Sequence, residues 1–125
     1  MILINKYVRI FVFWYDWGVF LFMGQDLLCE CGFSKDDALK ALTPLFINNA
    51  NNIIAQGVTH ALTGPVLRND AITLKKHMNC LNDNDIDLYK LLSQKLYEIS
   101  KNINPQKDYN EIKNLLFSED KNKWK

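Results

Sequence analysis

The chain has 125 residues, of which 48% are hydrophobic and 23% are charged, and its formal net charge at pH 7 is +1. A chain of this length fits one domain, and its apolar content suffices for a core, so disorder is not the expectation. With 15 basic and 14 acidic residues scattered along it, the chain has no field that would concentrate nucleic acid, and we expect no nucleic-acid partner.

The first predicted helix covers residues 7–31 and is rich in aromatic side chains on every side. Gly32 is placed to end it as a left-handed cap. A helix that is apolar all round needs cover all round, which so short a chain struggles to provide. We therefore expect a second subunit or a second domain to supply the cover, and residues 1–23 stand apart as an atypical aromatic helix. A strand over residues 8–15 is the alternative, because β-branched and aromatic residues dominate there.

The same segment has some features of a secretory signal or a membrane segment. Lys6 and Arg9 precede an apolar run over residues 10–23, but no small-residue cleavage site follows. The run is shorter than the roughly 20 residues that cross a bilayer, and Asp16 lies within it. We therefore predict a buried helix and no membrane partner. A small membrane-attached helical protein that uses residues 8–23 is kept as the alternative.

The second predicted helix begins at Ser34 and ends at Gly57. Ser34 and Asp37 have the spacing of an acidic capping box. Pro44 has no backbone N–H and should bend the helix near Lys40. Apolar residues at three- and four-residue spacing predict one helical face that needs cover, made up of Leu39, Leu42, Phe46, Ala50 and Ile53. Ala38, Ala41, Leu45 and Ile54 widen this face.

Three further helices are predicted after a loop at 58–69. They cover about 70–81, then a segment after a turn at 82–85 that Asn84 or Asp85 caps, then about 109–117; the tail at 118–125 is expected to fray. Their predicted buried faces are Ala71, Leu74, Met78 and Leu81; Leu88, Leu92, Leu96 and Ile99, flanked by Tyr89 and Tyr97; and Ile112, Leu115 and Leu116. The predicted fold class is all-α, with about five helices in a single helical domain over residues 1–125.

The three cysteines are expected to be reduced thiols. Cys29, Cys31 and Cys80 are an odd number in a chain without a clear secretory signal, which favours a cytoplasmic location over a disulfide framework. A metal site would need His77 to join them, but Cys29 and Cys31 would point about 200° apart on a helix. We therefore expect no metal.

The most unusual stretch is 61–70, which reads Ala-Leu-Thr-Gly-Pro-Val-Leu-Arg-Asn-Asp. Gly64 before Pro65 predicts a sharp, non-helical turn. Asp70 can cap the next helix, and Arg68 beside that helix start can grip a carboxylate or a phosphate. The plain alternative is that Arg68 pairs with Asp70 or a neighbouring acid and only holds the loop.

The histidines are weaker candidates. His77 lies on the same side of its helix as Asp70 and could act as a general base, although a hydrogen-bonded helix histidine is the simpler interpretation. His60 has no partner that the sequence identifies. The chain carries no glycine-rich dinucleotide fingerprint, P-loop, nucleophile elbow or zincin motif, so we assign no cofactor-binding or catalytic residue. A stand-alone enzyme that uses Arg68 and His77 is the least favoured hypothesis.

Residues 37–81 carry a pattern that resembles a known family. It consists of Ala-Leu-Thr-Pro-Leu-Phe at 41–46, Asn-x-x-x-x-Gly at 52–57 and Ala-Leu-Thr-Gly-Pro-x-x-Arg-x-Asp at 61–70, followed by Thr73 and His77. The pattern is similar to the helical C-terminal domain of Rossmann-like oxidoreductases, catalogued as domain of unknown function 2520.

The resemblance implies a fold and a role. The fold is a helical bundle like the C-terminal domains of 6-phosphogluconate dehydrogenase, ketopantoate reductase and pyrroline-5-carboxylate reductase, which mediate dimerisation and close the substrate cleft. In the family, an N-terminal Rossmann domain for NADP comes first; it is absent from this sequence, so this chain of an NAD(P)-dependent oxidoreductase would be inactive alone. Expected partners are a second copy or a separate Rossmann domain. By this analogy the substrate cleft is lined by Thr63, Gly64, Pro65, Arg68, Asp70 and His77.

The chain departs from the family near its start. Residues 24–28 fit the family, whereas residues 7–22 do not, because family members carry a small residue followed by asparagine near positions 14–16. Together with the missing cofactor domain, this departure leads to the hypothesis of a truncated or frame-shifted gene product.

Overall fold

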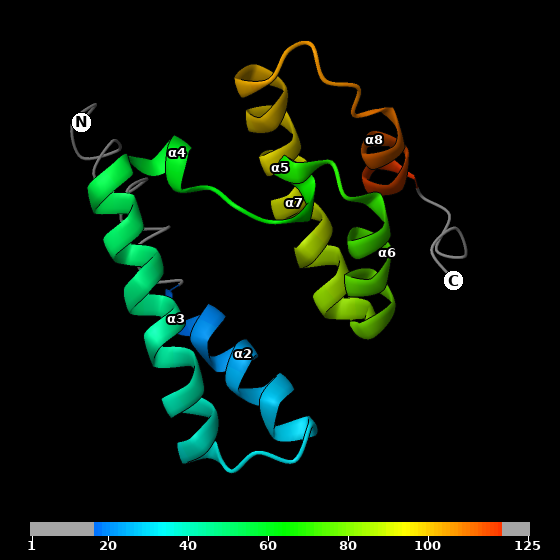
Figure 1. Ribbon diagram of the computed structural model, residues 1–125. Helices are drawn as coiled ribbons and strands as arrows, with labels where there is room; N and C mark the ends of the chain where they lie inside the picture. Colours follow the sequence, from blue (N-terminus) through cyan, green and yellow to red (C-terminus); the bar gives the residue numbers. More distant parts are fainter. Residues whose placement is uncertain (1–16, 119–125) are drawn as a thin grey trace, which may run out of the picture. The chain divides into compact units, whose positions relative to one another are not determined.

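The computed structural model describes residues 17–118, in which every regular element is a helix (Figure 1). The seven helices of this range are α2 (Trp17–Glu30), α3 (Lys35–Gln56), α4 (Val58–Ala61), α5 (Pro65–Arg68), α6 (Ala71–Cys80), α7 (Asp83–Ile103) and α8 (Asn110–Phe117). The all-α prediction is confirmed. The count exceeds the predicted five because two one-turn helices, α4 and α5, lie in the segment expected to be a loop.

Several predictions fall outside the described residues. The start of the aromatic helix, the alternative strand at 8–15 and most of the fraying tail belong to residues 1–16 and 119–125. Among the described residues, no helix combines the length and apolar character needed to cross a membrane.

The chain divides into two compact units, Met1–Ala55 and Gln56–Lys125. We call them unit 1 and unit 2. The boundary falls at the last turn of α3, so α2 and nearly all of α3 belong to unit 1, and α4 to α8 belong to unit 2. That one domain spans residues 1–125 stays a prediction.

The described part of unit 1 is a helical hairpin whose connection is built as the sequence predicts. Gly32 has φ +95°, and the N–H groups of Gly32 and Phe33 donate to the carbonyls of Cys29 (2.9 Å) and Leu28 (3.1 Å). This pair of bonds is a Schellman motif, which satisfies the last carbonyls of α2. The predicted left-handed cap at Gly32 is therefore confirmed.

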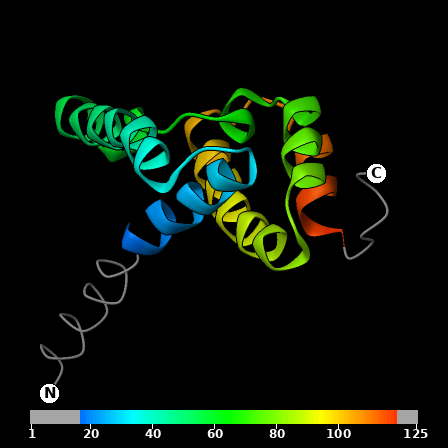
Figure 2. The same cartoon turned by 90° about the horizontal axis from the view of Figure 1, so that it is seen from below.

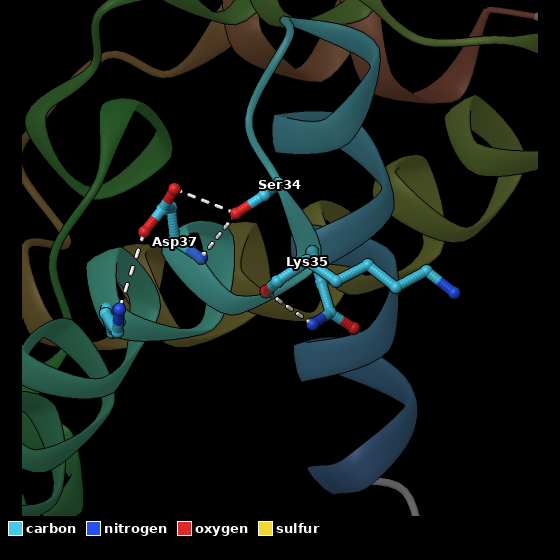
Figure 3. A network of polar contacts seen from close by, with 5 residues as sticks. Ser34, Lys35 and Asp37 are labelled. Carbon is cyan, nitrogen blue, oxygen red and sulfur yellow. Dashed lines mark hydrogen bonds and ion pairs between the residues drawn. The ribbon is translucent and has the colours of Figure 1, made fainter.

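The cap predicted at the start of α3 is formed by Ser34 and Asp37, although the Asp37 carboxylate bonds the Ser34 hydroxyl and not the backbone N–H that a full capping box uses (Figure 3). Ser34 Oγ accepts a bond of 3.1 Å from the backbone N–H of Asp37 and donates one of 2.8 Å to its carboxylate. Gln25 Nε2 donates to the carbonyl of Lys35 at 2.9 Å, which ties α2 to the first turn of α3. The two helices approach closely where Gly24 faces Leu42, because a Cβ at Gly24 would lie 3.3 Å from the leucine methyls.

The apolar faces predicted for this hairpin are not buried within the described residues. No residue of α2 is buried, and Ala38 is the one buried residue of α3. Of the five residues that make up the predicted face of α3, Leu39 and Phe46 are exposed and the others are half-buried. Two helices alone can cover only the seam between them, so the cover expected from a second subunit or a second domain stays a prediction. The helix continues through Pro44, and the bend expected near Lys40 stays a prediction.

Unit 2 holds the core, which is formed by α5 to α8. Helices α6 and α8 lie side by side in both views (Figures 1 and 2). The side chains of Leu74 and Met78 on α6 and of Ile112 and Leu116 on α8 are almost fully buried. The buried faces predicted for α6 and α8 are therefore confirmed, with Leu81 partly buried at the edge.

The face predicted for α7 is only partly right. Leu96 packs against the core, and the flanking Tyr97 is buried. Leu92 is 48% exposed, and the residues that α7 buries are Ile86, Ser93, Tyr97 and Ser100. Apolar residues occur on both sides of α7, so spacing alone could not select the buried side. Serine can be buried because its hydroxyl bonds its own helix, as the 2.7 Å bond from Ser100 Oγ to the carbonyl of Leu96 shows.

The cap predicted for α7 also needs correction. The N-cap is Asn82, not Asn84 or Asp85, and its Oδ1 accepts a 2.9 Å bond from the N–H of Asp85. All four residues of 82–85 are of types that cap helices well. The first of them takes the role, and the helix starts earlier than predicted.

Candidate functional site

The segment between α4 and α6 is shaped by a glycine that no other residue replaces without strain. Gly64 has φ 110° and ψ 176°, a conformation that is essentially restricted to glycine. It turns the chain so that Pro65 occupies the first position of α5, where its missing N–H costs no hydrogen bond. The predicted Gly-Pro turn is confirmed.

The one-turn helix α5 is closed tightly at its far end. Asn69 adopts the left-handed conformation with φ 63°, and its N–H donates to the carbonyl of Val66 at 3.0 Å. The N–H of Asp70 donates to the carbonyl of Pro65 at 2.8 Å. Val66 is only 1% exposed within the core of unit 2, so its side chain anchors the turn to that core.

Asp70 caps α6 as predicted. Its two carboxylate oxygens accept bonds from the backbone N–H (2.9 Å) and the hydroxyl (2.7 Å) of Thr73. These bonds hold the pKa of Asp70 below its ordinary value, and the positive charges of Arg68 and Lys76 act weakly in the same direction.

A second group of residues, which the sequence interpretation missed, holds the same turn from the segment before α8. The hydroxyl of Tyr109 donates to the carbonyl of Leu67 at 3.1 Å, and Lys107 Nζ donates to the carbonyl of Arg68 at 3.1 Å. Asn69 Nδ2 donates to the carbonyl of Asp108 at 2.7 Å. We call residues 107–109 the loop latch. About 40 residues of sequence separate the two sides of each bond, so no local pattern points to them.

Arg68 is therefore held by its backbone while its side chain is exposed. Its guanidinium takes part in none of the ion pairs of residues 17–118, which include Lys40–Asp37 and Lys75–Glu111. The pairing of Arg68 with Asp70 or a neighbouring acid, expected as the plain alternative, is thus not formed in this range.

His77 lies in the last turn of α6 and contacts α7. Its Nδ1 lies 2.8 Å from the hydroxyl of Tyr89, and the two rings meet edge to face at 5.8 Å between centroids. Burial raises the pKa of Tyr89, although a bond from Ser93 opposes this, so the phenol stays protonated and can donate to the imidazole. The interpretation as a hydrogen-bonded helix histidine is confirmed.

The sequence comparison decides the family of this chain. Residues 19–96, more than half of the 125, match the family model described as a domain of unknown function, DUF2520. The chain belongs to the DUF2520 family. No curated protein and no solved structure matches it. The DUF2520 match begins within α2, contains α3 to α6 with the Gly-Pro turn and Arg68, and ends within α7, before the loop latch.

The structure brings together five of the six candidate cleft residues of this DUF2520 domain. Thr63, Gly64, Pro65, Arg68 and Asp70 all belong to the turn that leads into α6. His77 does not join them, since seven residues of helix separate it from Asp70, or about 10 Å of axial rise. Arg68 lies two residues before Asp70, so a substrate that contacts both Arg68 and His77 would have to span a similar distance. The role of each residue in a cleft stays a prediction.

The side chains that usually bind metal ions do not gather in the described part of the DUF2520 chain. No group of three or more histidine, cysteine or acidic side chains in residues 17–118 could hold a metal ion. Cys29, Cys31 and Cys80 are free thiols, and His60 is exposed in α4.

Proposed function

We propose that this chain is the helical C-terminal domain of an NAD(P)-dependent oxidoreductase, in which it shapes the substrate cleft and mediates dimerisation. The nicotinamide cofactor binds a Rossmann domain through a glycine-rich turn at a helix start, and residues 1–125 contain no such turn. In this proposal the chain is therefore inactive alone, and NADP binds a Rossmann domain outside residues 1–125. The proposal also places the protein in the cytoplasm.

The observation that carries the proposal is the mounting of Arg68 within the family match. The carbonyls of Leu67 and Arg68 each accept a hydrogen bond from a side chain of the loop latch. The next helix, α6, then starts at once with the Asp70 cap. Because the backbone at Arg68 is already fixed, binding an anion carries no cost for ordering the loop, and only the side-chain torsions lose freedom. Bidentate bonds to a carboxylate or a phosphate then fix the orientation of a substrate.

The roles of the other cleft candidates follow from this arrangement. Gly64 and Pro65 set the direction of the turn, and Asp70 ends it, so they position the guanidinium without contacting substrate. Thr63 is exposed just before the turn and offers a hydroxyl to the same ligand. His77 acts at a distance in this proposal, as part of the contact between α6 and α7.

The test starts with the coding sequence upstream of Met1, read in all three frames. We expect a segment with Gly-x-Gly-x-x-Gly after a predicted strand within about 150 codons, the usual length of one domain. The extended chain should bind NADPH in a fluorescence titration, whereas residues 1–125 alone should not. Replacement of the second fingerprint glycine by valine in the extended chain is the control and should abolish binding.

Two results would contradict the proposal. One is an upstream region without a glycine-rich fingerprint. The other is NADPH binding by residues 1–125 alone, which would place the cofactor site in the helical domain itself.

A further inference from the structure

The α2–α3 hairpin exposes more apolar surface than a stable hairpin can leave in water. Ile54 is 83% exposed, Leu45 67% and Phe22 60%. A hollow of about 420 Å³ lies beside Trp17 and Ile54, and a second of about 250 Å³ adjoins it and shares Trp17. An apolar surface of this kind usually marks an interface.

The hairpin has no core of its own in the described residues. Ala38 is its one buried side chain there, whereas unit 2 buries a full cluster from α5 to α8. Two helices that bury so little are marginal in water, because helices in proteins take most of their stability from the packing of an apolar face. The hairpin therefore needs a partner that covers this face.

The charge pattern identifies the kind of partner. Neither residues 17–25 of α2 nor residues 41–56 of α3 contain an acidic, basic or histidine side chain. An acidic or basic partner has nothing to pair with on such a surface. A second copy of the same surface brings no like charges together, because there are none to oppose, and identical surfaces meet about a twofold axis.

Asn49 adds a second argument for a copy of the same chain. It is the one polar side chain that lines either hollow, and it lines both. A carboxamide carries both a donor and an acceptor, so it can pair with its own copy across a twofold axis. A polar amide within an apolar helix interface also fixes the register of the helices.

We propose that the α2–α3 hairpin packs against the same hairpin of a second copy, with Ile54 buried in the interface and Asn49 setting its register. This names the surface behind the dimerisation in the proposed function and rests on that part of it. It does not depend on the identity of the cofactor or the substrate.

The first test compares two exposed isoleucines by size-exclusion chromatography with light scattering on the full chain. Ile54→Glu should raise the dissociation constant of the dimer on the order of tenfold or more, since it places a charge in an apolar interface. Ile72→Glu is the matched control, because Ile72 is 69% exposed but lies on α6 in unit 2. The wild type and Ile72→Glu should remain equally dimeric.

A second pair tests the register. Asn49→Asp should weaken the dimer at neutral pH, because it places two carboxylates opposite each other, whereas Asn51→Asp should not, because Asn51 lines neither hollow. Circular dichroism checks that each variant keeps its helices. If Ile54→Glu loses them, the asparagine pair decides.

A monomeric wild type would overturn the proposal, as would a dimer that Ile54→Glu and Asn49→Asp leave as tight as their controls do. The latter result would leave dimerisation intact and refute only this surface. NADPH binding by the extended chain tests the proposed oxidoreductase separately.

Discussion

Arg68 is held in place by a hydrogen bond to its backbone, while its side chain is exposed. The carbonyl of Arg68 accepts from Lys107 Nζ, while the guanidinium joins no ion pair within residues 17–118. We expect Arg68→Ala to change the free energy of unfolding by no more than about 0.5 kcal/mol, as for other surface substitutions. Urea denaturation measures this. A loss well above about 1 kcal/mol would show that the side chain holds the loop after all.

Asp70 should make the stability of unit 2 depend on acid pH. Because Thr73 holds the pKa of Asp70 below its ordinary value, the contribution of the charge is complete above the unfolded pKa of about 4 and is lost as pH falls through the lower, folded pKa. Asp70→Asn keeps a good capping residue but cannot titrate. The difference in unfolding free energy between wild type and variant should therefore shrink below about pH 4. Thermal or urea unfolding between neutral and acid pH measures it, and a constant difference would refute the assignment.

At the level of single residues, the sequence predicts caps better than contacts. Ser34, Asp37 and Asp70 act as expected because a cap bonds residues two or three positions away. The loop latch could not be predicted, because Tyr109 and Leu67 are brought together by the packing of α5, α7 and α8.

The Gly-Pro turn is the element whose conformation depends most on one residue. A Cβ at Gly64 would meet nothing within 4 Å, so Gly64→Ala should cost only the backbone strain at φ 110°, about 1–3 kcal/mol. Gly18→Ala is a control without this strain, because Gly18 is the second residue of the described α2 and has equally open space around it. Alanine there should change the free energy of unfolding by less than about 0.5 kcal/mol. Chemical denaturation of both variants checks the contrast. Equal effects would contradict the role of Gly64.

Among the helices, their presence was easier to predict than their orientation. The spacing of apolar residues located α6 and α8 and their buried faces, because each has a single apolar side. It was only partly right for α7, in which Leu96 packs against the core but Leu92 is exposed and Ser100 is buried, since two apolar sides compete and serine does not mark a core. It also expected a buried face on α3, whose cover the described residues do not supply.

The two units should differ in what protects their backbone amides. Unit 2 has an internal core, so its amides should exchange at a rate that is independent of protein concentration. In the proposed dimer the hairpin of unit 1 relies on a second copy, so exchange in α2 and α3 should speed up on dilution as dimers dissociate. Hydrogen–deuterium exchange with mass spectrometry at two protein concentrations measures both units in one sample. Identical behaviour of α3 and α6 on dilution would contradict this expectation.

The position of residues 107–109 has a practical consequence for anyone who trims this protein. The DUF2520 match stops at residue 96, yet Lys107 and Tyr109 bond the carbonyls beside Arg68. A fragment of residues 19–96 would keep the Gly-Pro turn and Arg68 but lose the two side chains that hold the turn. An expressed fragment should therefore extend to the end of α8, because the segment that supports the turn is longer than the segment that the family model matches.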